Sequence, residues 1–140
     1  MFNYRINAYK KAVIKNFAFL KDAKNIQDVF LRAIPIENSG FLIPLSNAHE
    51  IDYDLLKKLT DWRNKNVLVY PTQFLATIES TKSWVRDRLL VAEDRILFLV
   101  VDNQGKVAGH IGFNGCLNNE LFFEIDNVIK GESHTEKGLF

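Results

Sequence analysis

Two mainly apolar runs joined by a short polar link stand out in the second half of the chain. The runs cover residues 95–101 and 106–113, and the link Asp102-Asn103-Gln104-Gly105 ends in glycine. Gly105 can adopt the positive φ that closes a short loop without a Cβ clash, so the pattern predicts a β-hairpin. The continuous apolar content of residues 96–101 also predicts that the first strand is covered on both faces.

A third apolar run, residues 121–128, follows after another polar link. It is predicted to lie beside the second strand of the hairpin. Two carboxylates, Glu124 and Asp126, interrupt this run. Because they are two positions apart, their side chains are expected on the same side of the strand.

Helical spacing dominates the first quarter of the chain. Apolar residues recur every three or four positions over residues 5–34, which predicts one broken or two short amphipathic helices ending at Pro35. This apolar stripe is expected to pack in the core or against a partner. Asn38-Ser39-Gly40 is a turn cluster. We place a domain boundary there, between a helical extension of residues 1–39 and a domain of residues 40–140.

The domain opens with an apolar run and a predicted helix. Residues 41–45 contain Pro44, which cannot donate a hydrogen bond to a central ladder, so we expect an edge or terminal strand. Asp52 is a plausible N-cap for the helix. Apolar residues at intervals of four, four and three continue from Ile51 to Trp62.

A second helix is predicted to start at Thr77 or Ser80 and to carry Trp84 on its core face. Residues 65–76, before it, show no strong period and indicate an ordered loop. The order is therefore strand, helix, helix and an antiparallel three-strand meander. This order predicts a mixed α/β fold of α+β layers, in which helices cover the hairpin.

Composition bounds the class of protein. The 140 residues are 47% hydrophobic with a formal net charge of +1, which fits one core and gives no general attraction to nucleic acid. Cys116 is the single cysteine, so an intrachain disulfide is excluded. No apolar run is long enough to span a bilayer, and we expect a cytoplasmic protein. His49, His110 and His134 are far apart in the sequence, so no metal site is expected.

Several local motifs accompany this order of elements. They are Trp62-Arg63-Asn64 at the end of the first domain helix, Trp84 in the second, Val107-Ala108-Gly109-His110-Ile111-Gly112 after the turn, and Glu124-Ile125-Asp126-Asn127-Val128 in the third strand. Together they resemble the GNAT superfamily of acyl-CoA-dependent N-acetyltransferases, over about residues 40–140. The similarity is greatest to the branch that acetylates amines of small molecules, including amino sugars on nucleotide carriers. It implies acetyl-CoA as co-substrate and a primary amine as acceptor.

The resemblance also implies where acetyl-CoA binds. In the family the thioester arm lies beside the fourth strand and bonds its backbone like an added strand, which corresponds here to Asn127, Val128 and Ile129. The pyrophosphate then binds amides at the start of the next helix. In this chain that turn would run from Lys130-Gly131 to Gly138. The family's usual Gln/Arg-x-x-Gly-x-Gly/Ala loop is not present, and an exposed polar loop is the alternative interpretation.

The family's reaction is a direct attack of a neutral amine on the thioester, with a base that takes the ammonium proton. Glu124 and Asp126 are our candidates for the base or for a water relay, and His110 for a substrate contact or second base. The alternatives are a solvated or salt-bridged face for the two carboxylates and a hydrogen-bonded core residue for His110.

The acceptor side is expected to be lined by Arg63, Asn64 and Tyr70. For Arg63 the alternative is a favourable interaction with the C-terminal end of the helix macrodipole.

Phe140 lies where the helix that completes the cofactor site would begin, so the resemblance implies a domain truncated after its fourth strand. The resemblance therefore implies either the N-terminal piece of a longer protein or a domain whose last strand is supplied by something else. In both cases we expect the isolated 140-residue chain to associate, to rearrange or to lack catalytic activity. Its edge, ending at Val128, is expected to favour self-association.

The competing hypothesis is a non-catalytic module that senses a small ligand or docks a protein. In that case the N-terminal helices would connect it to another domain. A nucleic-acid binder is disfavoured, because aromatic and basic residues are not interleaved on any one strand.

Overall fold

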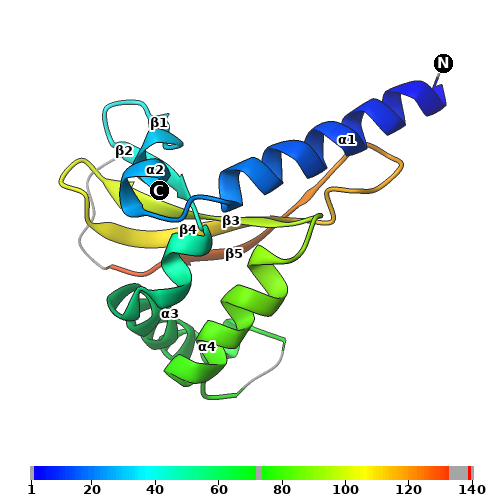
Figure 1. Cartoon of the computed structure of the whole chain (residues 1–140). Helices are drawn as coiled ribbons and strands as arrows, with labels where there is room; N and C mark the ends of the chain where they lie inside the picture. Colours follow the sequence, from blue (N-terminus) through cyan, green and yellow to red (C-terminus); the bar gives the residue numbers. More distant parts are fainter. Residues whose placement is uncertain (1, 72–73, 133–138, 140) are drawn as a thin grey trace.

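The computed structural model describes residues 2–71, 74–132 and 139, and it is a mixed α and β fold built on one open sheet (Figure 1). Five strands follow one another in the order β1-β2-β3-β4-β5, each antiparallel to its neighbour. The strands are β1 (Ile34–Ile36), β2 (Gly40–Pro44), β3 (Ile96–Asp102), β4 (Val107–Asn114) and β5 (Glu124–Lys130).

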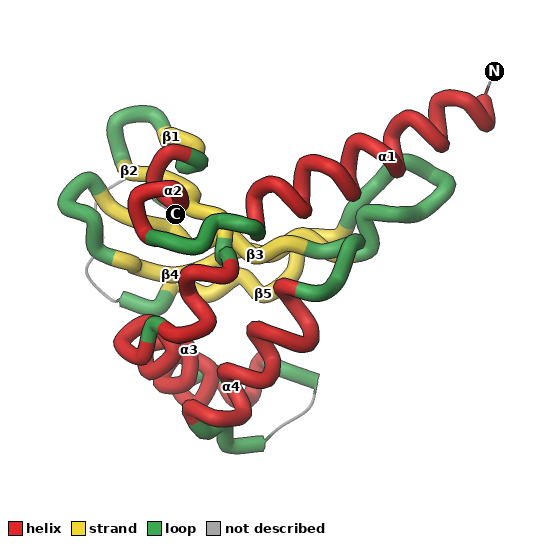
Figure 2. The backbone as a smooth tube through the Cα atoms, viewed as in Figure 1, coloured by secondary structure: helices red, strands yellow, loops and turns green. Residues whose placement is uncertain are grey.

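Helices occupy the N-terminal segment and the long connection between β2 and β3 (Figure 2). They are α1 (Phe2–Lys21), α2 (Ile26–Leu31), α3 (Tyr53–Lys65) and α4 (Ile78–Trp84), with a π-helical turn at Val85–Leu90 and 3-10 turns at Asn47–Ile51 and Val67–Val69. In Figure 1, α3 and α4 lie together below the sheet, and α1 extends away from them.

The predicted hairpin is confirmed as β3 and β4. Gly105 has φ +83°, the conformation that its place at the end of the turn requires. Residues 96–101 are all buried, as the continuous apolar run predicted. Their alternating side chains serve two clusters: Leu97, Leu99 and Val101 pack toward α3, whereas Val100 packs with Ala108 and Leu139.

The prediction that residues 41–45 form an edge strand is wrong. β2 pairs with β1 on one side and with β3 on the other. The β1 ladder covers only Gly40 to Leu42, so it ends before Pro44. The next residue, Leu45, donates its N–H to Leu97 of β3, and the backbone of Pro44 therefore faces the side without a partner strand. An interior strand can thus contain this proline at its end.

The helical N-terminal run ends earlier than predicted. α2 stops at Leu31, and residues 34–36, including Pro35, form the outermost strand of the sheet. The boundary that we placed after residue 39 falls in the turn between β1 and β2. Ala23 and Val29 also belong to the main core cluster.

The other local predictions are largely confirmed. Asp52 caps α3 by accepting a hydrogen bond from the N–H of Leu55 at 3.1 Å, and Thr77 caps α4 through Ser80. The third strand lies beside β4, as expected, but it begins only at Glu124. Leu121, with φ +61°, precedes it outside the sheet.

Lys21 fastens the end of α1 to the segment that leads into β3. Its side chain is 5% exposed, and Nζ donates to the carbonyls of Ala92 and Arg95, both at 2.5 Å. Burial lowers the pKa of this ammonium to about 8. In the first half of α1, Lys10 donates a hydrogen bond to Asn119 Oδ1 in the loop before β5, at 2.6 Å.

We expect Lys21→Met to lower the free energy of unfolding by about 2 kcal/mol, because it keeps the aliphatic stem but leaves two carbonyls without their donor. Urea unfolding monitored by circular dichroism would measure the change. Lys15→Met removes an exposed charge from the same helix and should change stability little. Equal effects of the two substitutions would contradict the anchoring role.

The described helices include none that combines the length and the apolar character needed to cross a bilayer.

Candidate functional site

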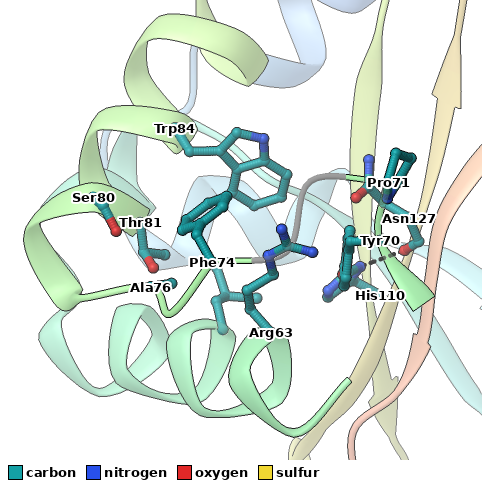
Figure 3. A pocket seen from close by; sticks show the side chains of 11 residues that line it. Arg63, Tyr70, Pro71, Phe74, Ala76, Ser80, Thr81, Trp84, His110 and Asn127 are labelled. Atoms are coloured by element: carbon teal, nitrogen blue, oxygen red, sulfur yellow. Dashed lines mark hydrogen bonds between the residues drawn. The ribbon is translucent and has the colours of Figure 1, made fainter. Parts of the chain in front are cut away.

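A cavity of about 290 Å³ lies between α3, α4 and the β4–β5 end of the sheet (Figure 3). The loop that joins α3 to α4 forms one of its walls. The described residues that line the cavity are Leu59, Arg63, Tyr70, Pro71, Phe74, Ala76, Ser80, Thr81, Trp84, His110 and Asn127. Its volume suits a molecule of about the size of an amino acid or a monosaccharide.

Three consecutive residues at the end of α3 hold the surroundings of the cavity in place. Trp62 is buried and its indole ring lies 6.2 Å from the His110 ring, centroid to centroid. The Arg63 guanidinium carbon lies 3.4 Å from the Tyr70 ring centroid and 4.7 Å from that of Phe74. Asn64 makes two hydrogen bonds to the backbone of Ala76, at 3.0 and 2.7 Å.

His110 lies at the base of the cavity and is 3% exposed. Its Nδ1 is 2.5 Å from the carbonyl oxygen of Asn127 (Figure 3). A carbonyl can only accept, so Nδ1 carries the hydrogen and Nε2 of the neutral ring has a lone pair. Burial lowers the pKa of His110 to about 4, although the Asn127 carbonyl acts in the opposite direction. At neutral pH the ring is therefore uncharged.

The strand β5 contains an irregularity next to His110. His110 pairs with Ile129 and Gly112 pairs with Asp126, so one more residue lies on β5 than on β4 between these two pairs. Asn127 has φ +49°, a left-handed conformation that few residues other than glycine and asparagine adopt readily. This is a β-bulge, and it brings the Asn127 carbonyl to His110.

The three proposed catalytic residues occupy different surroundings. His110 lines the cavity, whereas Glu124 and Asp126 are not among the residues that do. Glu124 is exposed at the far end of β5, opposite Asn114. Asp126 is half-buried, with Oδ2 3.9 Å from Nη2 of Arg95. Gly112 leaves room for this carboxylate, because a Cβ at residue 112 would overlap Asp126 Oδ1.

The residues expected to bind acetyl-CoA lie along β5 and just after it. Asn127 lines the cavity, Val128 is exposed, and Ile129 is buried. Lys130 is exposed at the end of the strand. Gly131 packs directly against the Trp62 indole, where a Cβ would overlap the ring. Gly138 lies outside the described residues.

Of the residues expected to bind the acceptor, Arg63 and Tyr70 both line the cavity. Asn64 contributes by fixing the loop at Ala76. No pattern in the sequence indicated Phe74, and the helical spacing placed Trp84 in the core alone. Trp84 is only half-buried and lines the cavity from α4. The signal that could have identified both residues is the concentration of aromatic residues in and around the loop between the two helices.

No cluster of three or more potential metal ligands occurs among the described residues. Cys116 is buried, and burial raises the pKa of its thiol, so the unreactive protonated form is favoured.

Comparisons with protein-family models, with curated proteins and with solved structures return no match for this chain.

Proposed function

We propose that the protein is an N-acyltransferase that moves an acyl group, acetyl in the simplest case, from acyl-CoA to the amine of a small molecule. The observation that carries this proposal is the bulge at Asn127. It lies on the strand at the end of the sheet, and Asn127 also lines the cavity. A donor bound along β5 and an acceptor in the cavity would meet at this residue.

The geometry of β5 fits an extended acyl-CoA arm. Within the described part of the chain, β5 pairs with β4 alone, so alternate N–H and C=O groups point away from the sheet. An extended ligand can use such groups as an additional strand would. The bulge interrupts the regular alternation next to the cavity, where a reacting carbonyl would need a backbone donor.

His110 supplies a proton acceptor beside the same point. The thioester provides the electrophilic carbon; the amine nitrogen forms the new C–N bond, the C–S bond breaks, and the sulfur leaves as thiol once protonated. The lone pair on His110 Nε2 can orient an amine N–H and can accept the proton that the nitrogen loses after bond formation. Because a pKa of about 4 makes this imidazole a weak base, the amine must arrive uncharged.

The carboxylates have a different part in this proposal. Asp126 faces Arg95 rather than the cavity, and Glu124 lies at the opposite end of the strand. Either could still relay a proton through solvent. The geometry favours His110 as the group closest to the acceptor.

The competing function is that of a non-catalytic module that binds a small ligand. The cavity by itself supports this function equally well. The bulged sheet edge, which a ligand sensor does not need, is the observation that favours the transferase.

Acetyl-CoA should raise the melting temperature of the protein. At a concentration 100 times its Kd the stabilisation is about 2.7 kcal/mol, which corresponds to roughly 5–10 °C for a chain of this size. Differential scanning fluorimetry would measure the shift, and mass spectrometry of a mixture of amines would detect transfer. No shift at millimolar acetyl-CoA would contradict the proposal, whereas ligand binding without transfer would support the sensor.

Two substitutions at Asn127 provide matched variants. Asn127→Gly retains easy access to positive φ and should keep most of the thermal shift. Asn127→Val opposes that conformation and should abolish most of it. Equal thermal shifts in both variants would show that acetyl-CoA binding does not depend on the bulge at Asn127.

A further inference from the structure

The described lining of the cavity contains one charged side chain. Among the described residues that line it, Arg63 is the only one with a charge at neutral pH, because His110 is neutral there. No carboxylate belongs to the described lining. The remaining walls are mainly aromatic and aliphatic. A polyamine or any acceptor with several ammonium groups would meet the like charge of Arg63 here.

Arg63 is held in a defined orientation. Its guanidinium extends from α3 between Tyr70 and Phe74, with carbon-to-centroid distances of 3.4 and 4.7 Å (Figure 3). Stacking uses the faces of the guanidinium, whereas its N–H donors lie in the plane of the group. Asn64, the next residue, fixes the loop that carries Phe74 through its two hydrogen bonds to Ala76. The cation is thus a positioned part of the wall.

The charge and the shape of the Arg63 guanidinium each affect which acceptor the cavity can bind. A planar guanidinium with in-plane donors suits a carboxylate or phosphate, which it can bind through two parallel hydrogen bonds. The same positive charge disfavours a second cation in the cavity, so it favours the neutral form of the acceptor nitrogen. Neutral nitrogen is the form that attacks a thioester.

We propose that the cavity selects acceptors in which the amine belongs to a molecule that also has an anionic oxygen group, a carboxylate or a phosphate, bound by Arg63. The reactive role of the amine rests on the proposed transferase function, but the binding preference does not. The aromatic walls formed by Tyr70, Phe74 and Trp84 then accommodate the body of the acceptor.

Binding measured without an acyl donor tests this selection directly. L-phenylalanine and 2-phenylethylamine differ by a carboxylate, and glucosamine 6-phosphate and glucosamine differ by a phosphate. Isothermal titration calorimetry should show the anionic member of at least one pair binding about tenfold to a hundredfold more tightly. The two pairs distinguish a carboxylate from a phosphate. Spermidine, a polycation, should bind more weakly than either anionic probe.

Variants then connect the preference with Arg63. Arg63→Gln should abolish the difference within the pair, and Arg63→Lys should retain part of it because the charge remains. Lys65→Gln removes an equal charge from an exposed position on the same helix and should leave the preference unchanged. Melting temperatures of all variants verify that they are folded.

The outcomes separate this inference from the transferase proposal. Arg63-dependent binding of an anionic amine without acyl transfer supports the inference and overturns the transferase. Acyl transfer with equal or better use of the neutral or cationic probes overturns the inference and retains the transferase. Equal effects of Arg63→Gln and Lys65→Gln, or binding of none of the probes, also overturn the inference.

Discussion

Replacing Gly131 by alanine is expected to lower the free energy of unfolding by about 3 kcal/mol, or roughly 10 °C in melting temperature. A Cβ at residue 131 would overlap three carbon atoms of the Trp62 indole ring. The ring cannot move away easily, since Trp62 is 4% exposed and belongs to the main core cluster. The backbone of residue 131 is also fixed, because its N–H donates to the carbonyl of Ala108 at 2.8 Å.

Two controls distinguish this overlap from a general effect of removing a glycine. Gly105→Ala introduces a Cβ that meets no atom within 4 Å, at a residue with φ +83°, so it should cost only about 1 kcal/mol of backbone strain. In a Trp62→Leu background, the Gly131→Ala substitution should cost much less than in the parent. An undiminished cost in that background, measured by urea unfolding as a double-mutant cycle, would contradict the packing explanation.

Gly131 also shows what sequence reasoning could and could not find. The resemblance assigned it to a phosphate-binding turn, because backbone amides at the start of a helix attract a pyrophosphate. The close approach that the structure reveals is to Trp62, more than 60 positions earlier in the chain. A sequence pattern can indicate that another group lies close to the backbone of a glycine, but it does not identify that group.

The elements themselves were predictable because each follows from local chemistry. The turn at Gly105 and the caps Asp52 and Thr77 depend on residues within a few positions of one another. Pro44 misled the prediction because its tolerance depends on how far β1 extends alongside it, a non-local property. Strand order and the length of a neighbouring ladder depend on residues far apart in the sequence, so no short segment predicts them.

The candidate site was predicted in part for the same reason. Arg63 and His110 belong to the motifs of the resemblance and Tyr70 to the loop between the two helices, and all three line one cavity. The emphasis on Glu124 and Asp126 came from their alternation in an ideal strand. The bulge at Asn127 adds a residue after them, and Asp126 meets Arg95 rather than the cavity. An extra residue in a strand changes the direction of its side chains, and the sequence of residues 121–128 contains no pattern that predicts this bulge.

Replacing His110 by asparagine is expected to remove much of the pH dependence of stability below pH 6.5. The asparagine amide can still donate to the Asn127 carbonyl, but it cannot titrate in this range. In the parent the folded pKa of His110 is about 4, below the value of 6.5 for the unfolded chain. The unfolded state therefore binds more protons between these two values. The contribution of the neutral His110 ring to the free energy of unfolding is complete above pH 6.5, and it decreases by about 3 kcal/mol as the pH falls to 4.

Urea unfolding at a series of pH values would measure this dependence for the parent and for His110→Asn. Burial also lowers the pKa of His49, so the variant should retain the part of the acid sensitivity that His49 contributes. The difference between the two curves isolates His110. If the variant loses stability with acid as steeply as the parent, the buried imidazole does not titrate as its surroundings indicate.

The same variant should have a much larger effect on acyl transfer than on stability at pH 8, where His110 is neutral in both states. Loss of a positioned proton acceptor typically lowers a rate by a factor of about 10² to 10⁴, and we expect a decrease of this order in kcat. KM for the acceptor should change little, because Arg63 and the aromatic walls remain. Glu124→Gln is the matched comparison: its exposed side chain at the far end of β5 predicts a kcat close to that of the parent. Should Glu124→Gln abolish turnover while His110→Asn retains it, the strand carboxylate and not the cavity histidine would be the base.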